Sequence, residues 1–309
     1  MTDRMQVLAI GECMIEMSGG ADGTWRLGFA GDTLNTLWYV RAGLDPKDGP
    51  VGYFTALGDD HFSDRILAFL KLNGIETRLI RRLEGRRPGL YLIEQREGDR
   101  HFTYWRETSA ARQLADDEAT VAAAMKAAEA IYFSGITLAI LKPDARARLI
   151  ALASTARRQG KLVAFDPNIR PALWENVEVM RQTLMTAAGA ASILLPSFDD
   201  ERRIFGDATP GATAARYHDA GADEVAVKDG GAPVLISRDG RSRDVPVPQA
   251  AQVIDPTGAG DSFNGAYLAS RLGGAEPEEA AVAGIEMAAK VIAQHGGIVP
   301  LDAARRWSS

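Results

Sequence analysis

The sequence predicts an α/β protein with a mostly parallel central sheet, helices on both faces, and a smaller sheet inserted into this core. Two observations support this fold class. Short apolar runs typical of buried strands alternate with helix-like stretches along most of the 309 residues, and two segments break the alternation. A βαβα order implies a parallel sheet, because each helix carries the chain back across the sheet. A chain of this length can bury a large core, so we expect one domain over 1–309.

The regular elements follow one another from the N-terminus. Phe62, Ile66, Leu67 and Leu70 share one helical face, and Gly74 is placed to end that helix. The expected strands cover 7–11, 51–57, 131–134, 162–165, 193–195 and 225–228. The expected helices cover 33–42, 62–70, 116–129, 143–159, 177–188, 198–205 and 211–220.

Residues 12–30 and 86–106 interrupt this alternation. Segments 89–95 and 100–106 alternate apolar and polar residues around Gly98-Asp99, which predicts a β-hairpin. Segments 14–17 and 25–29 could supply further strands. The hairpin and these strands form either a lid that projects from the core or an extension of the main sheet's edge.

Composition excludes several classes of function. The formal charge of −6 gives no electrostatic support for nucleic-acid binding. Cys13 is the single cysteine, so neither an internal disulfide nor a cysteine zinc site can form, and the four histidines are scattered. The N-terminus lacks the pattern of a signal peptide, and no apolar run reaches the roughly 20 residues needed to span a bilayer. We therefore expect a cytoplasmic protein that binds neither nucleic acid nor membrane.

The segment Asp255-Pro-Thr-Gly-Ala-Gly-Asp261 carries the strongest functional signal. It lies between a short apolar run and a helix-like run, and its glycines allow close approach of a ligand to the backbone. Unpaired amides at a helix N-terminus attract anions, so Gly258, Ala259 and Gly260 are placed to meet phosphoryl charge. Asp261 would repel a phosphate and is interpreted instead as a general base facing a hydroxyl. The alternative is a simple turn whose acid stabilises the helix.

Other phosphate-binding motifs are absent. The chain contains no G-x-x-x-x-G-K-[ST] sequence and no protein-kinase motif set. The expected first strand is followed by Gly11-Glu-Cys-Met-Ile-Glu16 and not by G-x-G-x-x-G, which disfavours a nicotinamide-dependent oxidoreductase.

The string D-x-T-G-A-G-D-S-F near the C-terminus resembles the signature of the ribokinase/phosphofructokinase-B family of sugar kinases. The resemblance implies a ribokinase-like three-layer α/β/α sandwich, a β lid over the sugar, and ATP with Mg²⁺ as cofactors. Val227-Lys-Asp-Gly-Gly231 resembles the family's nucleotide segment, and the helix around Met287 resembles its adenine wall. A solvated lysine and plain core packing are the alternatives for Lys228 and Met287. The implied nucleotide-binding residues are Asn168, Lys228, Gly230, Gly231, Gly258, Gly260 and Met287.

Two segments depart from the family pattern. Ser197-Phe-Asp-Asp200 stands where the family has N-x-x-E, which leaves Asp200 as the implied metal-binding carboxylate. Ala30-Gly-Asp-Thr-Leu-Asn35 stands in place of the sugar-binding G-G-x-x-x-N, with alanine for the first glycine. Gly31 would admit a sugar closely, while Asp32 and Asn35 would bind its hydroxyls. Asp32 as a helix N-cap is the alternative.

Two arginines point to an acidic acceptor. Arg106 ends the hairpin, and Arg170 follows the end of an expected core strand, where ligands gather in parallel sheets. Arginine binds carboxylates through two hydrogen bonds, although each arginine could instead form an internal ion pair. Further strings, including Pro88-Gly-Leu-Tyr91 and Phe102-Thr-Tyr-Trp-Arg106, are similar to those of bacterial 2-keto-3-deoxygluconate kinases over nearly the whole chain. The implied substrate-binding residues are Gly31, Asp32, Thr33, Leu34, Asn35, Tyr91, Tyr104, Trp105, Arg106 and Arg170.

This resemblance implies ATP-dependent phosphorylation of 2-keto-3-deoxygluconate at its C6 hydroxyl, with Asp261 as base. A kinase for fructose or a related sugar acid, and a non-catalytic sugar or nucleotide sensor, are the alternatives. Exposed lid strands often pair between subunits, so a homodimer or higher homo-oligomer is a further expectation.

Overall fold

The computed structural model describes residues 4–19, 23–96 and 99–308. Its centre is a nine-stranded sheet in the order β15-β14-β13-β12-β11-β10-β1-β4-β6. The strands from β6 to β13 run parallel, and β14 and β15 form an antiparallel edge, which confirms the mostly parallel sheet. The strands of this sheet are β1 (Met5–Ile10), β4 (Val51–Phe54), β6 (Ile75–Glu76), β10 (Ala128–Ser134), β11 (Leu162–Asp166), β12 (Ile193–Leu194), β13 (Glu224–Val227), β14 (Val234–Arg238) and β15 (Arg241–Val245).

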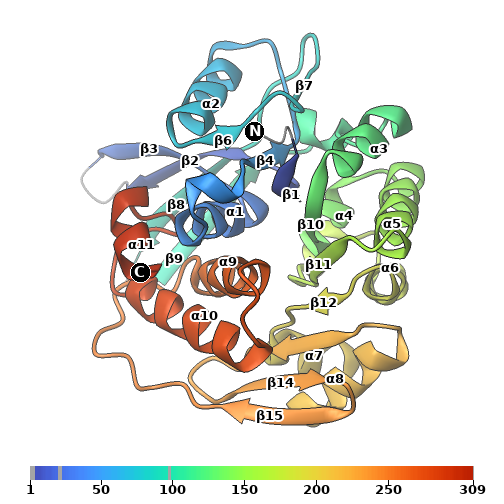
Figure 1. Ribbon diagram of the computed structural model, residues 1–309. Helices are drawn as coiled ribbons and strands as arrows, with labels where there is room; N and C mark the ends of the chain where they lie inside the picture. The colour runs from blue at the N-terminus through green and yellow to red at the C-terminus, as the bar shows by residue number, and fades with distance from the viewer. Residues whose placement is uncertain (1–3, 20–22, 97–98, 309) are drawn as a thin grey trace.

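Helices cover both faces of this sheet, as predicted, and two apolar clusters lie between the layers. Figure 1 shows α3 to α6 on one side and α1 with α9 to α11 on the other. The α-helices are α1 (Asp32–Gly43), α2 (His61–Leu72), α3 (Glu118–Lys126), α4 (Gly135–Ile140), α5 (Pro143–Arg158), α6 (Val177–Gly189), α7 (Phe198–Phe205), α8 (Pro210–Asp219), α9 (Ala259–Leu272), α10 (Pro277–Ile292) and α11 (Leu301–Ser308). Short 3₁₀ helices cover Pro46–Asp48, Ala110–Gln113 and Pro171–Leu173. None of the helices in the described residues has the length and apolar character required to cross a membrane.

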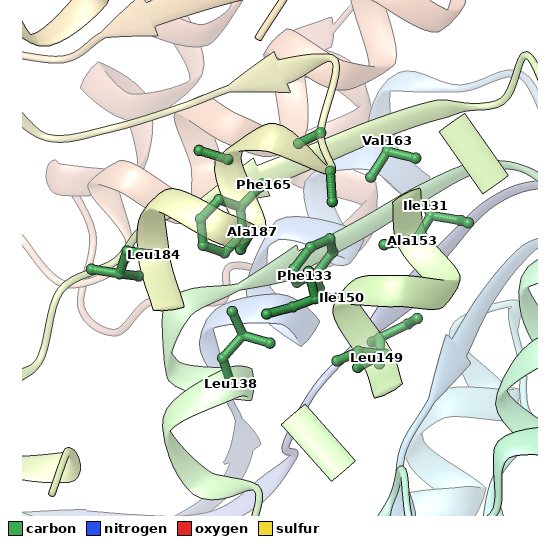
Figure 2. Packing of buried hydrophobic residues seen from close by; sticks show 14 of the residues in the cluster. Ile131, Phe133, Leu138, Leu149, Ile150, Ala153, Val163, Phe165, Leu184 and Ala187 are labelled. Carbon is green, nitrogen blue, oxygen red and sulfur yellow. The ribbon is translucent and has the colours of Figure 1, made fainter. Parts of the chain in front are cut away.

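The central strands divide their side chains between the two clusters. On β10, Ile131 and Phe133 face one cluster, while Ala130 and Tyr132 face the other. This is the period of two that a buried strand imposes. Figure 2 shows the first cluster, in which Phe133 lies beside Phe165 of β11 with ring centroids 4.9 Å apart.

The segments that break the alternation form a separate four-stranded sheet. Its order is β3-β2-β8-β9, with β2 and β8 parallel and both outer pairs antiparallel. The hairpin is therefore confirmed, although Gly98 of its expected turn lies outside the described residues, as do residues 20–22. The sheet is not an edge extension of the main one. Its strands are β2 (Met14–Gly19), β3 (Trp25–Ala30), β8 (Leu90–Arg96) and β9 (Asp99–Trp105).

Several boundaries differ from the predictions. The strand expected over 51–57 is divided, because β5 (Ala56–Leu57) leaves the main sheet and pairs with β7 (Arg81–Arg82). The helix expected over 116–129 ends earlier, since Ala128 already pairs with Met5 of β1. The β14–β15 hairpin was not predicted. Asp239 and Gly240 form its turn with φ of 51° and 71°, as a tight hairpin requires.

Candidate active site

A cavity of about 490 Å³ lies between the carboxyl edge of the main sheet and the small sheet. Residues at the N-termini of α1 and α9 form its floor, and residues of β8 and β9 form its roof. Most of the predicted site residues meet there. Those that line it are Gly31, Asp32, Asn35, Tyr91, Tyr104, Arg106, Asn168, Arg170, Asp200, Lys228, Gly258, Ala259, Gly260 and Asp261.

Asp261 stands in the first turn of α9, whose N-cap is Gly258. Its Oδ2 accepts a hydrogen bond of 2.8 Å from the side-chain amide of Asn35 on α1. Burial raises the pKa of Asp261 to about 7, and the neighbouring carboxylates of Asp32 and Asp166 add to the rise. The Asn35 hydrogen bond and the Lys228 charge oppose it. A carboxylate with this pKa accepts a proton at neutral pH more readily than an ordinary aspartate.

The glycine turn before α9 is closely packed. Gly258 has φ of 78°, and a Cβ atom there would lie 2.7 Å from the Cα of Gly297. The amide of Ala259 donates to the carbonyl of Pro256 at 3.2 Å, so this amide is already engaged. The amides of Gly260 and Asp261 lie in the first helical turn, where a helix supplies no acceptor of its own. These two amides and the helix dipole make the electrostatic potential positive at this part of the floor.

Lys228 is buried at the end of β13, so the alternative of a solvated lysine is wrong. Its Nζ lies 3.2 Å from Asp166 Oδ2 and 2.8 Å from Asn264 Oδ1. A Cβ built on Gly260 would lie 3.7 Å from the same nitrogen. The ammonium group therefore sits beside the glycine turn, where it could compensate phosphoryl charge.

Gly31 and Asp32 connect the floor to the small sheet. A Cβ on Gly31 would lie 2.0 Å from the carbonyl oxygen of Glu12, so the glycine is required by the backbone that leads into β2. Gly31 is the N-cap of α1, which makes the N-cap interpretation of Asp32 wrong. Asp32 instead accepts from Asn168 Nδ2 at 2.9 Å, and burial raises its pKa.

The two arginines differ in their surroundings. Arg106 is 7% exposed and donates from Nη2 to Glu12, which is itself 2% exposed. For Arg106 the alternative of an internal ion pair is therefore realised, although the residue also lines the cavity. The Arg170 side chain is 52% exposed, and its Nη1 lies 3.5 Å from Asp200 Oδ2. Arg170 is thus the arginine whose guanidinium is available to a ligand.

Aromatic rings complete the roof. Tyr91 donates from its hydroxyl to Glu16, and its ring centroid lies 5.7 Å from that of Tyr104. The rings of Phe102 and Tyr104 lie in nearly parallel planes, and both side chains are about half exposed. Both line the cavity, so these apolar surfaces face the space that a ligand would fill.

Six predicted residues do not line this cavity. Thr33 and Leu34 are fully buried, because they lie on the core side of the first turn of α1. Trp105 ends β9 between Tyr104 and Arg106, which both line the cavity, so strand alternation turns it to the other face. Met287 packs in the core, as the alternative interpretation held. Gly230 and Gly231 lie beyond the cavity in the turn after β13, and their nucleotide contacts remain predictions.

Two charged residues of the site were missed from the sequence, namely Glu12 and Asp166. Glu12 stands two residues after β1 and Asp166 ends β11, and this position at the end of a core strand was the available signal. The side chains of Met14, Phe102 and Ile136 also line the cavity. Their apolar character gave no sign that they would do so.

Asp200, the predicted metal-binding carboxylate, lies on the wall of the cavity. Asp200 pairs with Arg203 at 2.6 Å as well as with Arg170. Within the described ranges, no three His, Cys, Asp or Glu side chains converge as metal ligands. Mg²⁺ in phosphoryl-transfer sites needs only one or two carboxylates beside the substrate phosphates.

A larger cavity of about 790 Å³ lies under the β2–β3 half of the small sheet. Segment 295–298 closes its other side. The larger volume does not mark the reaction centre, because the glycine turn with Asp261 and Lys228 opens into the smaller cavity.

Known proteins resemble this chain over almost its full length. A pfkB family carbohydrate kinase model matches residues 4–304. The 2-dehydro-3-deoxygluconokinases of Dickeya dadantii and Escherichia coli K12 are 40% and 41% identical to it, over 96% of this chain and 97% and 98% of theirs. The crystal structure of a candidate ribokinase II from E. coli in complex with ATP and Mg²⁺ superposes with a TM-score of 0.82, at 24% identity and 98% coverage of both chains. The chain therefore has the ribokinase-type fold that the sequence predicted.

Proposed function

The chain belongs to the pfkB family of carbohydrate kinases, and from this premise we propose that it phosphorylates 2-keto-3-deoxygluconate at the C6 hydroxyl with ATP. The substrate is also called 2-dehydro-3-deoxygluconate, the acceptor named for the two relatives described above. One observation carries the proposal. A partly buried carboxylate with a raised pKa, Asp261, and a half-exposed guanidinium, Arg170, open into one cavity beside an electropositive helix end.

The acceptor binds in the cavity with its acid end toward Arg170. A charge-assisted pair between the guanidinium and the substrate carboxylate replaces the 3.5 Å contact of Arg170 with Asp200. Tyr91, Tyr104 and Phe102 cover the carbon chain from the roof. Closure of the small sheet as a lid would exclude water and limit wasteful hydrolysis of ATP.

Asp261 then acts as general base. Its carboxylate takes the proton of the C6 hydroxyl while O6 forms a bond to the γ-phosphorus, and the bond from that phosphorus to the β–γ bridging oxygen breaks to release ADP. The amides of Gly260 and Asp261, the α9 dipole and Lys228 are positioned to compensate the charge of the group in transfer. Gly258 and Ala259 shape the turn that holds these amides.

Mg²⁺ supplies charge neutralisation of the nucleotide phosphates in such transfers. The donor set fits a hard cation, because Asp200 offers a carboxylate on the wall of the cavity. We retain Asp200 as the proposed protein ligand, and Asn168, Gly230 and Gly231 as proposed nucleotide contacts.

A substrate panel tests the proposal. Purified protein is supplied with ATP, Mg²⁺ and one acceptor at a time: 2-keto-3-deoxygluconate, its galactonate-derived epimer, gluconate, fructose or ribose. The expected result is ADP release with the keto-deoxy acid, and product mapping that places the phosphate on C6. Preferred turnover of fructose would support a kinase for a neutral sugar. Ligand binding without turnover of any acceptor would support a sensor.

Location and assembly belong to the same proposal. The single cysteine, Cys13, is buried, and this burial raises the pKa of its thiol. An ATP-dependent enzyme with one buried thiol and no disulfide fits the reducing, ATP-rich cytoplasm. The homo-oligomer expected from the exposed small sheet remains a prediction, which sedimentation or light scattering would test.

A further inference from the structure

We infer that Asn35 is a positioning residue for Asp261, holding one oxygen of that carboxylate so that the other oxygen faces the acceptor hydroxyl. The sequence suggested that Asn35 binds a sugar hydroxyl. The inference rests on the proposed function, because it assigns Asp261 the role of base. It concerns how that base is held and kept ionised.

Asn35 uses both ends of its side-chain amide within the protein. Its Oδ1 accepts from the backbone amide of Gly31 at 3.3 Å, and its Nδ2 donates to Asp261 Oδ2 at 2.8 Å. Only one orientation of the amide satisfies both partners, since the Gly31 amide can only donate and a carboxylate can only accept. Asn35 is 7% exposed, so this arrangement is largely shielded from water.

The hydrogen bond spans two helices. Asn35 lies on α1 and Asp261 in the first turn of α9, and these helices pack against each other along their length. The terminal torsion of an aspartate is broad when nothing holds it. Fixing Oδ2 through α1 therefore removes that freedom and leaves Oδ1 to receive the proton.

The bond also favours the ionised form of the carboxylate. Burial raises the pKa of Asp261, and Asp32 and Asp166 raise it further. Opposing them are the Asn35 hydrogen bond and the Lys228 ammonium. The charged and titratable groups that face Asp261 from the surrounding elements are Asp32 and Tyr39 on α1, Tyr132 on β10, Asp166 on β11 and Lys228 after β13. Within the described part of the chain none of these five groups donates a hydrogen bond to the Asp261 carboxylate, so the neutral amide of Asn35 has a distinct part in this balance.

Two substitutions test the inference. Asn35→Leu removes the donor at similar volume, and Asn35→Asp replaces it with a second carboxyl group. For the leucine variant we expect kcat to fall by about 10–100-fold. In the pH profile of kcat/KM, the acid limb should move to higher pH by about one unit, which is the size expected for losing a hydrogen bond to a charged group. The KM for the sugar acid should stay within about threefold. In Asn35→Asp the two carboxyls titrate as a pair, and the limb should move further.

Matched controls are available at Asn73, which caps α2 outside the cavity through a 2.8 Å bond to Phe69. Asn73→Leu and Asn73→Asp should leave the acid limb in place. If Asn35→Leu fails to fold, Asn35→Asp, which is nearly isosteric, still gives the result. An unmoved limb together with a raised sugar KM would overturn the inference and restore Asn35 as a hydroxyl ligand.

A readout without turnover separates this inference from the proposed function. Protein labelled with ¹³C at aspartate carboxyls is titrated by NMR, and the Asp261 signal is identified by its loss in Asp261→Asn. The midpoint should be higher in Asn35→Leu than in the unsubstituted protein, and equal midpoints would contradict the inference. Failure of the proposed function would appear differently, as absence of 2-keto-3-deoxygluconate turnover in the unsubstituted protein.

Discussion

The floor and the roof of the cavity are built in different ways. The floor consists of two helix ends, which carry Asp32, Asn35 and Asp261, and the end of strand β13, which Lys228 follows. These side chains are held by hydrogen bonds to one another or to buried neighbours. The roof is a four-stranded sheet that presents aromatic rings, two of them about half exposed. From this difference we assign chemistry to the hydrogen-bonded floor, and recognition to the roof and to the rim of the cavity, where the half-exposed Arg170 follows β11.

The largest expected effect concerns the floor. Asp261→Asn removes the base with little change in shape, and kcat should fall by roughly 10²–10⁴-fold. Steady-state kinetics at saturating ATP would measure it. Turnover within a few-fold of the unsubstituted enzyme would show that the floor does not supply the base.

The next largest effect is a loss of folding stability where the roof is attached to the core. Glu12→Gln would break a buried ion pair and leave the Arg106 guanidinium uncompensated, at a cost of about 3–5 kcal/mol in the free energy of unfolding. Urea denaturation would measure the loss. Asp199→Asn breaks an exposed pair with Arg202 and serves as control, with an expected cost of about 1 kcal/mol or less. Equal losses in the two variants would mean that the Arg106 pair does not secure the roof.

A smaller effect is expected at the rim. Arg170→Leu should raise the KM for the sugar acid by about 10–100-fold, which corresponds to losing a hydrogen bond to a charged group, and should affect a neutral analogue less. Competition by the acid and by its neutral amide would be compared in both proteins. Equal weakening of the two ligands would remove the argument that Arg170 recognises a carboxylate.

The smallest effect is a pH dependence. Because Asp261 must be ionised and its pKa is raised to about 7, kcat/KM should fall about tenfold per pH unit below that value. The free energy of unfolding should depend on pH in the opposite direction to the rate. From about pH 4 to 7 the folded protein keeps a proton that the unfolded chain has released, so this group's contribution to stability decreases as pH rises. A flat rate profile between pH 5.5 and 8 would contradict the assignment.

The sequence predicted the core of the fold well because its strands are buried and apolar. Segment 131–134 became part of β10 and segment 162–165 part of β11 with little change. The β15 strand was missed because it is polar and mostly exposed at the sheet edge, where no hydrophobic pattern marks it. Ala128 was assigned to a helix because local propensity favours alanine there, whereas pairing with β1 determines the structure.

The site was predictable to the extent that local motifs define it. The glycine turn and Asp261 are contiguous in sequence. The prediction that they share one site with Asn35 and Arg170 rested on family resemblance. The sequence could not reveal that Glu12 holds Arg106, because the two residues are distant in the chain and each is ambiguous alone. The need for glycine at position 31 likewise arises from the carbonyl of Glu12, a tertiary contact that no local pattern encodes.

The account places the catalytic base, Asp261, on the floor and carboxylate recognition at Arg170 on the rim. Binding measured without turnover tests this assignment most directly. The unsubstituted protein, Asp261→Asn and Arg170→Leu would each be titrated calorimetrically with 2-keto-3-deoxygluconate in the presence of a non-hydrolysable ATP analogue and Mg²⁺. We expect Asp261→Asn to bind the acid within about threefold of the unsubstituted protein and Arg170→Leu to bind it at least about tenfold more weakly. The reverse order of affinities, with Asp261→Asn losing the ligand and Arg170→Leu retaining it, would contradict the account.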